Sequence, residues 1–116
     1  MDYPTAYNFL MDQGTALSSQ RNPDDLLRRL QQGKPPIPGQ VTAILLALKV
    51  VFEGLKEAKS LDRNLVWALY LLTVESQQLF ESGWNSGVDW PPLLKEDLHR
   101  IAIAVQSIYC GIWQGG

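Results

Sequence analysis

The chain has 116 residues, of which 46% are hydrophobic and 19% charged, and its formal net charge is −2 at pH 7. These values fit one folded domain of common size and exclude a disordered chain. They also lack the clustered excess of Lys and Arg that nucleic-acid binding requires, so we expect no nucleic-acid partner.

Two short helices are predicted at the N-terminal end of a single domain that spans residues 1–116. The first is predicted over residues 4–14, because Pro4 suits the first helical position. The second is predicted over residues 23–32, with Asn22 as its cap and Gly33 as a left-handed residue at its end. We expect both helices to cover one side of the remaining bundle.

A proline-rich connector follows at residues 34–39. Three prolines in four positions exclude a helix interior and a central strand, so we expect a rigid, extended segment. Such a segment is preformed for recognition as a polyproline II helix, and it equally fits a spacer that fixes the angle between the flanking helices. The candidate partner-binding residues here are Pro35, Pro36, Ile37 and Pro38.

Two long helices are predicted next, over residues 40–59 and 62–82. In the first, apolar residues recur at intervals of three and four across four turns, as in an amphipathic helix. The second is apolar nearly all round from Val66 to Val74, which predicts a central helix that is buried on most sides. Gly83 is the expected stop of this second helix.

A loop with two tryptophans connects to the last helix. Its glycines, prolines and Asn-Ser pair predict irregular structure over residues 83–92. Aromatic residues on loops are frequent hot spots of protein interfaces, and they also close the ends of helical bundles. Trp84, Asp89 and Trp90 are therefore candidate partner-binding residues, with a structural role for the tryptophans as the alternative.

The last long helix is predicted over residues 92–109. Apolar residues recur there with a heptad spacing, which indicates a seam that packs against neighbouring helices or against a second copy of the chain. The tail from Gly111 is expected to fray. The seam residues are Leu94, Leu98, Ile101, Val105 and Ile108.

These elements predict an all-α fold: a compact antiparallel bundle of about five helices, three long and two short. The apolar runs are shorter than the roughly 20 residues that a membrane span needs, so no transmembrane segment is expected. The N-terminus has neither a basic region nor an apolar run, which argues against a signal peptide. The single cysteine, Cys110, excludes an intrachain disulfide and favours a reducing compartment.

Motifs for catalysis, metals and nucleotides are missing or incomplete. His99 and Cys110 are the only His and Cys, and eleven helical residues separate them by about 16 Å, too far for a catalytic dyad. Glu96 and His99 form one Glu-x-x-His motif, whereas a di-metal bundle needs two. Gly33-Lys34 does not match the Walker pattern. We therefore expect no catalytic residues, no metal and no cofactor.

Residues 33–42, 44–49 and 87–94 resemble a small family of cyanobacterial all-helical proteins of about this length. The resemblance covers nearly the whole chain. Some relatives carry a dethiobiotin synthetase label, but that enzyme uses a phosphate loop on an α/β fold, which this sequence lacks. The resemblance implies a cyanobacterial protein in the cytoplasm or at the cytoplasmic face of thylakoids, and it supplies no catalytic residues.

The leading functional prediction is a non-enzymatic interaction module, an adaptor or regulator that binds another protein or pairs with itself as a homodimer. The alternative is a helical bundle that binds a small ligand or pigment among Trp67, Tyr70 and Phe80. The third hypothesis is an enzyme with a carboxylate-based site, which requires a strongly raised pKa of Glu75, Glu96 or Asp97 within a cleft.

Overall fold

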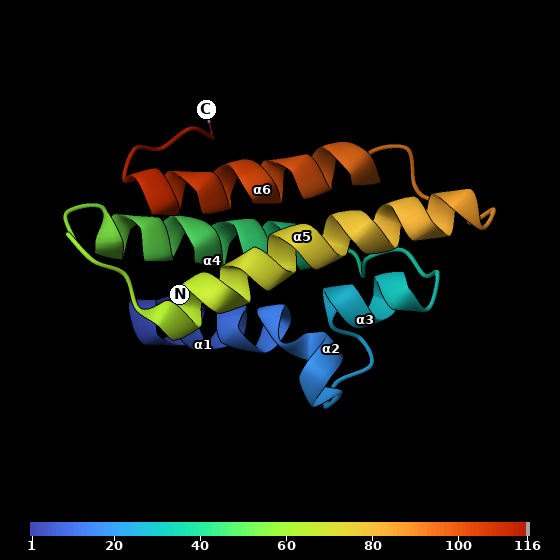
Figure 1. Ribbon diagram of the computed structural model, residues 1–116, viewed down its shortest axis with the longest axis horizontal. Helices are drawn as coiled ribbons and strands as arrows, with labels where there is room; N and C mark the ends of the chain where they lie inside the picture. The colour runs from blue at the N-terminus through green and yellow to red at the C-terminus, as the bar shows by residue number, and fades with distance from the viewer. Residues whose placement is uncertain (116) are drawn as a thin grey trace.

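The computed structural model describes residues 1–115, and these residues form six helices and no strand, so the all-α prediction is confirmed for this part of the chain. Four of the five predicted helices begin within two residues of their expected positions. The short α2 was not predicted (Figure 1). The helices are α1 (Tyr3–Gly14), α2 (Ala16–Ser19), α3 (Leu26–Gln31), α4 (Gln40–Leu55), α5 (Arg63–Asn85) and α6 (Leu94–Cys110).

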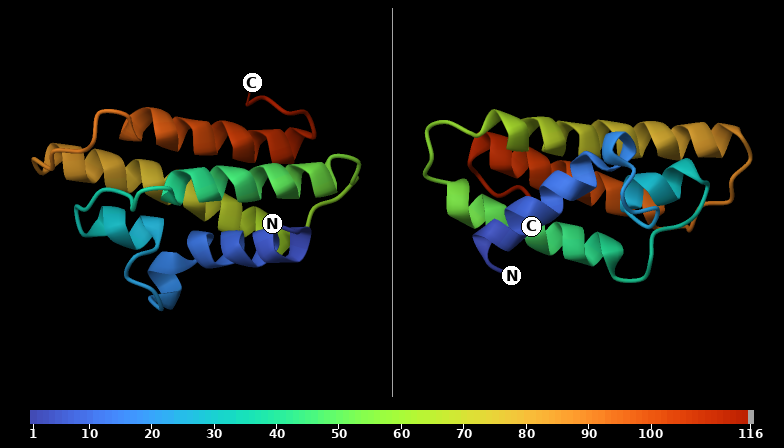
Figure 2. Two further views of the ribbon diagram at one scale, coloured as in Figure 1. Left: turned by 180° about the vertical axis from the view of Figure 1, so that it is seen from behind. Right: turned by 90° about the horizontal axis from the view of Figure 1, so that it is seen from below.

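The four longest helices form a ring in which α1 contacts α4 and α5, while α6 contacts the same two helices from the other side. The short α3 packs on α5 (Figures 1 and 2). The four longest helices alternate in direction along the chain, yet α1 and α5 run the same way, and so do α4 and α6 (Figure 1). The expectation of a purely antiparallel bundle is therefore not confirmed, because helices that neighbour each other in space are not always consecutive in sequence.

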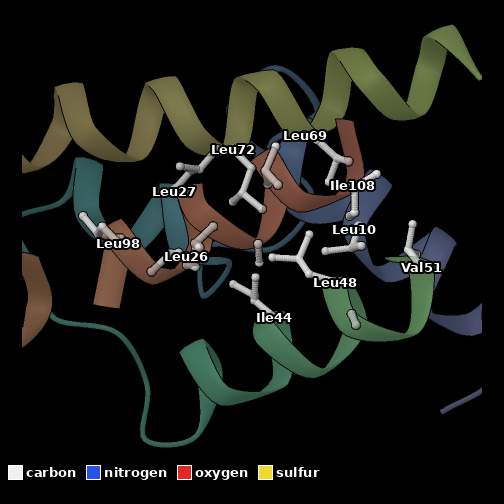
Figure 3. Packing of buried hydrophobic residues seen from close by; sticks show 14 of the residues in the cluster. Leu10, Leu26, Leu27, Ile44, Leu48, Val51, Leu69, Leu72, Leu98 and Ile108 are labelled. Carbon is white, nitrogen blue, oxygen red and sulfur yellow. The ribbon is translucent and has the colours of Figure 1, made fainter. Parts of the chain in front are cut away.

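The core lies inside this ring and receives side chains from every helix. Figure 3 shows Leu10 of α1, Leu48 of α4 and Leu69 of α5 meeting near its centre. The five seam residues of α6 are all buried in the same cluster. They therefore pack against neighbouring helices of their own chain, which leaves none of them free for a second copy. The seam residues are Leu94, Leu98, Ile101, Val105 and Ile108.

The short helix α3 begins at Leu26, three residues later than predicted. The side-chain oxygen of Asn22 accepts a hydrogen bond from the backbone N–H of Asp24 at 2.9 Å. This bond closes a local turn that competes with the first helical turn. The other end agrees with the prediction, because Gly33 has a φ of +73°.

The long helix α5 continues through Gly83 to Asn85, so the predicted stop at Gly83 is wrong. The indole of Trp90 packs on Gly83, where an added Cβ would lie 2.9 Å from Cε2 of that ring. The glycine thus provides room for a tryptophan rather than a helix end. The left-handed residue that follows the helix is Gly87, with a φ of +90°.

The first half of α5 is not buried on most sides. Leu65, Leu69 and Leu72 face the core, but Trp67 and Tyr70 are 56% and 48% exposed. Their rings stack on the surface with centroids 5.5 Å apart. The apolar run therefore combines a core face with an exposed aromatic face, which hydrophobicity alone does not distinguish.

The C-terminal tail contacts two helices through Trp113 and Gln114, whereas Ile112 is 66% exposed, and residue 116 lies outside the described residues. The expected fraying of the tail stays a prediction. Gly111 caps α6 in a left-handed conformation. The Trp113 ring lies against Phe52, and the Lys49 ammonium lies 4.0 Å from its centroid. The backbone N–H of Gln114 donates to the Ser107 hydroxyl at 2.8 Å. The tail thus lies across α4 and α6.

Candidate functional site

A groove lies between the second half of α5 and the first half of α6, with a volume of about 560 Å³. Helical spacing brings its lining together, because residues three or four apart share one helix face. Small-molecule sites commonly have volumes of about 300–1,000 Å³. We call this groove the Trp84 hollow. It is lined by Gln77, Phe80, Glu81, Trp84 and Asn85 of α5 and by Lys95, Leu98 and His99 of α6.

The apolar wall of the Trp84 hollow is a stack of three aromatic rings. Phe80 lies between Trp84 and Trp90, with centroids 6.5 Å and 6.1 Å away and planes tilted by about 20°. Trp90 is 6% exposed, and its indole N–H donates to the Phe80 carbonyl at 2.9 Å. Trp84, at 65% exposure, is the outer member of the stack. A fixed inner ring therefore supports a solvent-facing one.

Polar and charged side chains also line the groove beside this stack. Lys95 and His99 lie one turn apart on α6, and Glu81 faces them from α5. None of the three forms an ion pair with another group within residues 1–115. The Lys95 ammonium, the Glu81 carboxylate and the His99 imidazole are therefore available to a bound molecule.

A second, shallower hollow lies at the opposite end of the same two helices. It is lined by Arg63, Val66, Trp67 and Tyr70 of α5 and by Tyr109 of α6. The Tyr109 hydroxyl donates to the Val66 carbonyl at 3.0 Å, which ties α6 to α5, and burial raises the pKa of this phenol. We call this second site the Trp67 hollow.

The two hollows are the ends of one surface, the α5–α6 face, which runs from Trp67 and Tyr109 to Trp84 and Lys95. Val74 and Ala102 lie between the ends by helical spacing, and both are half-buried. Figures 1 and 2 show α5 and α6 side by side in opposite directions. The face is open, whereas the groove between α4 and α6 is covered by the tail.

The predicted site residues in the tryptophan loop separate into different environments. Trp84 belongs to α5 and lines the groove, whereas Trp90 is a buried support behind it. Asp89 is exposed outside the groove lining. Of the two candidate tryptophans, Trp84 is therefore exposed in the groove, whereas Trp90 has a structural role.

The proline connector lies outside the groove. The Arg29 guanidinium donates to the Pro35 carbonyl at 3.0 Å, and the Ile37 N–H donates to the Gln40 side chain at 3.1 Å. Pro36 is half-buried, while Pro35 and Pro38 are exposed. These bonds join the connector to α3 and to α4, as expected for a spacer that fixes the angle between the two helices.

Sequence reasoning missed much of the Trp84 hollow. Gln77, Phe80 and Trp84 already show the spacing of one helix face, and Lys95 and His99 show it on α6. That signal was obscured by the expected stop at Gly83, which placed Trp84 in a loop. His99 is exposed on α6 and lines the groove.

Catalytic carboxylates do not converge in the groove. Among residues 1–115, no group of three or more His, Cys, Asp or Glu side chains is placed to hold a metal ion. Glu96 is exposed, and Asp97 pairs with Arg100 on the surface at 3.4 Å. Burial raises the pKa of Glu75, but this residue is not part of the groove lining. The three carboxylates of the enzyme hypothesis therefore do not form a site together.

Glu75→Gln is expected to stabilise the protein more at pH 7 than at pH 3. The folded-state pKa is raised by burial, so the charged carboxylate disfavours folding above both pKa values, and this cost disappears once the group is protonated. Urea unfolding of both proteins at the two pH values measures the difference. Glu57→Gln, at an exposed carboxylate, is the control. A larger benefit at pH 3 would mean that a cation stabilises the Glu75 carboxylate.

Comparisons with protein-family models, curated proteins and solved structures gave no significant match. Within residues 1–115, no helix combines the length and the apolar character required to cross a membrane.

Proposed function

We propose that this protein is a non-enzymatic interaction module, an adaptor or regulator, which binds a partner protein through the α5–α6 face. The observation that supports this proposal is the exposure of three large aromatic side chains, Trp67, Tyr70 and Trp84, along one open face. Exposed tryptophan and tyrosine are enriched at the energetic centres of protein interfaces. Large apolar side chains gathered on a surface are typical of binding sites.

The groove also has the polar residues that an interface needs. Lys95, His99 and Glu81 border the aromatic stack and are not engaged in ion pairs within the described residues. Such a rim gives orientation and specificity around an apolar centre. The face thus combines a rigid aromatic surface with charges of both signs.

Binding to a partner is expected to depend on Trp67 and Trp84 and not on exposed apolar residues elsewhere. Tagged wild-type protein, Trp67→Ala and Trp84→Ala are used for capture from a native lysate, and the captured protein is then purified for calorimetric titration. Leu46→Ala is the matched control, because Leu46 is 58% exposed but lies on α4. We expect each tryptophan variant to bind at least about tenfold more weakly, since hot spots contribute 2 kcal/mol or more. Equal binding by all variants would refute the proposal.

The second candidate function is the binding of a small ligand or pigment. The Trp84 hollow supports it, because its volume of about 560 Å³ and its mixture of aromatic and polar groups fit a small-molecule site. The site differs from the one expected among Trp67, Tyr70 and Phe80, because only Phe80 of these three lines the hollow. Native mass spectrometry and an absorbance scan of freshly purified protein distinguish the two functions, because a retained ligand supports only the second.

A further inference from the structure

The two ends of the α5–α6 face resemble each other. Each end has a hollow bounded by both helices, and each has an exposed tryptophan on α5, Trp67 in one case and Trp84 in the other. The two tryptophans are 17 residues apart, which corresponds to about 25 Å along the helix. A half-turn about an axis that lies in the plane of the face and crosses both helices at its middle exchanges the two ends, so that α5 of a second copy lies antiparallel over α5 of the first. The face is thus suited to pairing with itself.

We propose that the partner on the α5–α6 face is a second copy of this chain, related by a two-fold axis that passes near Val74 and Ala102. In this arrangement, Trp67 of each copy lies in the Trp84 hollow of the other. The inference rests on the proposed function, which identifies this face as a protein-binding surface. The half-buried Val74 and Ala102 allow close approach at the axis.

The charges of the face are complementary under this rotation. Arg63 lies at the Trp67 end and Glu81 at the Trp84 end, so within one chain they are 18 residues apart, about 27 Å. With the two-fold axis near Val74, Arg63 of one copy lies opposite the neighbourhood of Glu81 in the other. The two residues are then offset by about one helical turn along the axis of α5. Both residues lack an ion-pair partner in their own chain within residues 1–115. Pairing of two copies supplies one for each.

The size of the face is close to that of a standard interface. α5 has 23 residues and is about 34 Å long, α6 has 17 residues and is about 26 Å long, and each is about 10 Å wide, which gives a projected area of about 600 Å². A standard protein interface buries about 800 Å² of accessible surface on each partner. The other helix grooves are less available, because the tail covers α4 and α6 and a close contact at Gly14 joins α1 to α5.

Sedimentation equilibrium over about 1–200 µM tests the pairing. Wild-type protein is expected to reach twice the mass of one chain, and Trp67→Glu and Trp84→Glu are expected to remain monomeric. Leu46→Glu on α4 is the control and should pair like the wild type. Circular dichroism of each variant establishes that loss of pairing is not loss of folding.

Charge reversal tests the relative orientation of the two copies. Arg63→Glu and Glu81→Arg should each weaken pairing at least about tenfold, because each creates two like-charge contacts in the dimer. Mixing these two single variants should restore pairing, and so should combining them in one chain. Since the two positions are about 27 Å apart within a chain, only contact between copies explains such a recovery.

A wild-type protein that remains monomeric up to 200 µM overturns this inference, and so does a dimer that both tryptophan variants leave intact. A dimer without recovery in the mixture overturns the two-fold arrangement. If the protein is monomeric but capture of another protein is lost in Trp84→Ala, the proposed function holds and only the identity of the partner is wrong. If the dimer forms and no other partner depends on these residues, the face is a self-association surface alone.

Discussion

Gly14→Ala is expected to lower the free energy of unfolding by about 2–3 kcal/mol. Alanine is ordinarily about 1 kcal/mol better than glycine within a helix, so propensity alone predicts stabilisation. At Gly14, however, an added Cβ would lie 2.6 Å from the carbonyl carbon of Ala68 and still closer to its oxygen. These are backbone atoms of α5, which cannot rotate away, so the contact between α1 and α5 must open. Overpacking of this kind costs about 1–3 kcal/mol or more, which outweighs the gain in propensity.

Urea and thermal unfolding measure the effect, and a loss of this size corresponds to a decrease in Tm of roughly 10 °C for a domain of this length. Gly39→Ala is the matched control. Gly39 has a φ of +83° and no atom within 4 Å of an added Cβ, so only the backbone conformation opposes substitution, at about 1–2 kcal/mol. Stabilisation by Gly14→Ala would show that α1 and α5 do not cross at this residue.

Local signals predicted the helices well because their causes are local. Apolar spacing located α4, α5 and α6, and Gly33 takes the left-handed conformation that its position after α3 suggested. The same signals failed where a distant residue decides the outcome. Gly83 lies within α5, and the ring of Trp90, seven residues later, occupies the space where a side chain at this position would lie. A sequence pattern does not contain that contact.

The candidate site was harder to predict for a related physical reason. Hydrophobicity alone does not distinguish a core residue from an exposed aromatic one, so the apolar run of α5 predicts that Trp67 and Tyr70 are buried. Their exposure depends on which flank of α5 the other helices cover, and this is a property of the assembled bundle. The seam of α6 illustrates the converse case, since a heptad pattern fits internal packing and pairing equally well. The structure places Ile101 and its companions in the core.

Trp90→Ala is expected to lower the free energy of unfolding by about 3–5 kcal/mol, whereas Trp84→Ala should lower it by less than about 1 kcal/mol. Trp90 is buried, packs on Gly83 and donates its indole N–H to the Phe80 carbonyl. Truncation of a buried tryptophan leaves a large cavity. Trp84 has most of its surface in solvent and loses mainly its stacking on Phe80.

Denaturant unfolding of the two variants measures this contrast. Trp90→Phe keeps one aromatic ring but removes the indole N–H and part of the ring volume, so its cost should lie above the roughly 1 kcal/mol of the hydrogen bond and below that of Trp90→Ala. This difference in stability distinguishes a binding defect caused by unfolding from one caused by the loss of a contact. Loss of a partner in Trp90→Ala would follow from disruption of the α5–α6 region, whereas the same loss in a stable Trp84→Ala variant reports on contact at the groove. If Trp84→Ala destabilised the protein as much as Trp90→Ala, Trp84 would be part of the core. Trp67 would then be the one exposed tryptophan of the α5–α6 face.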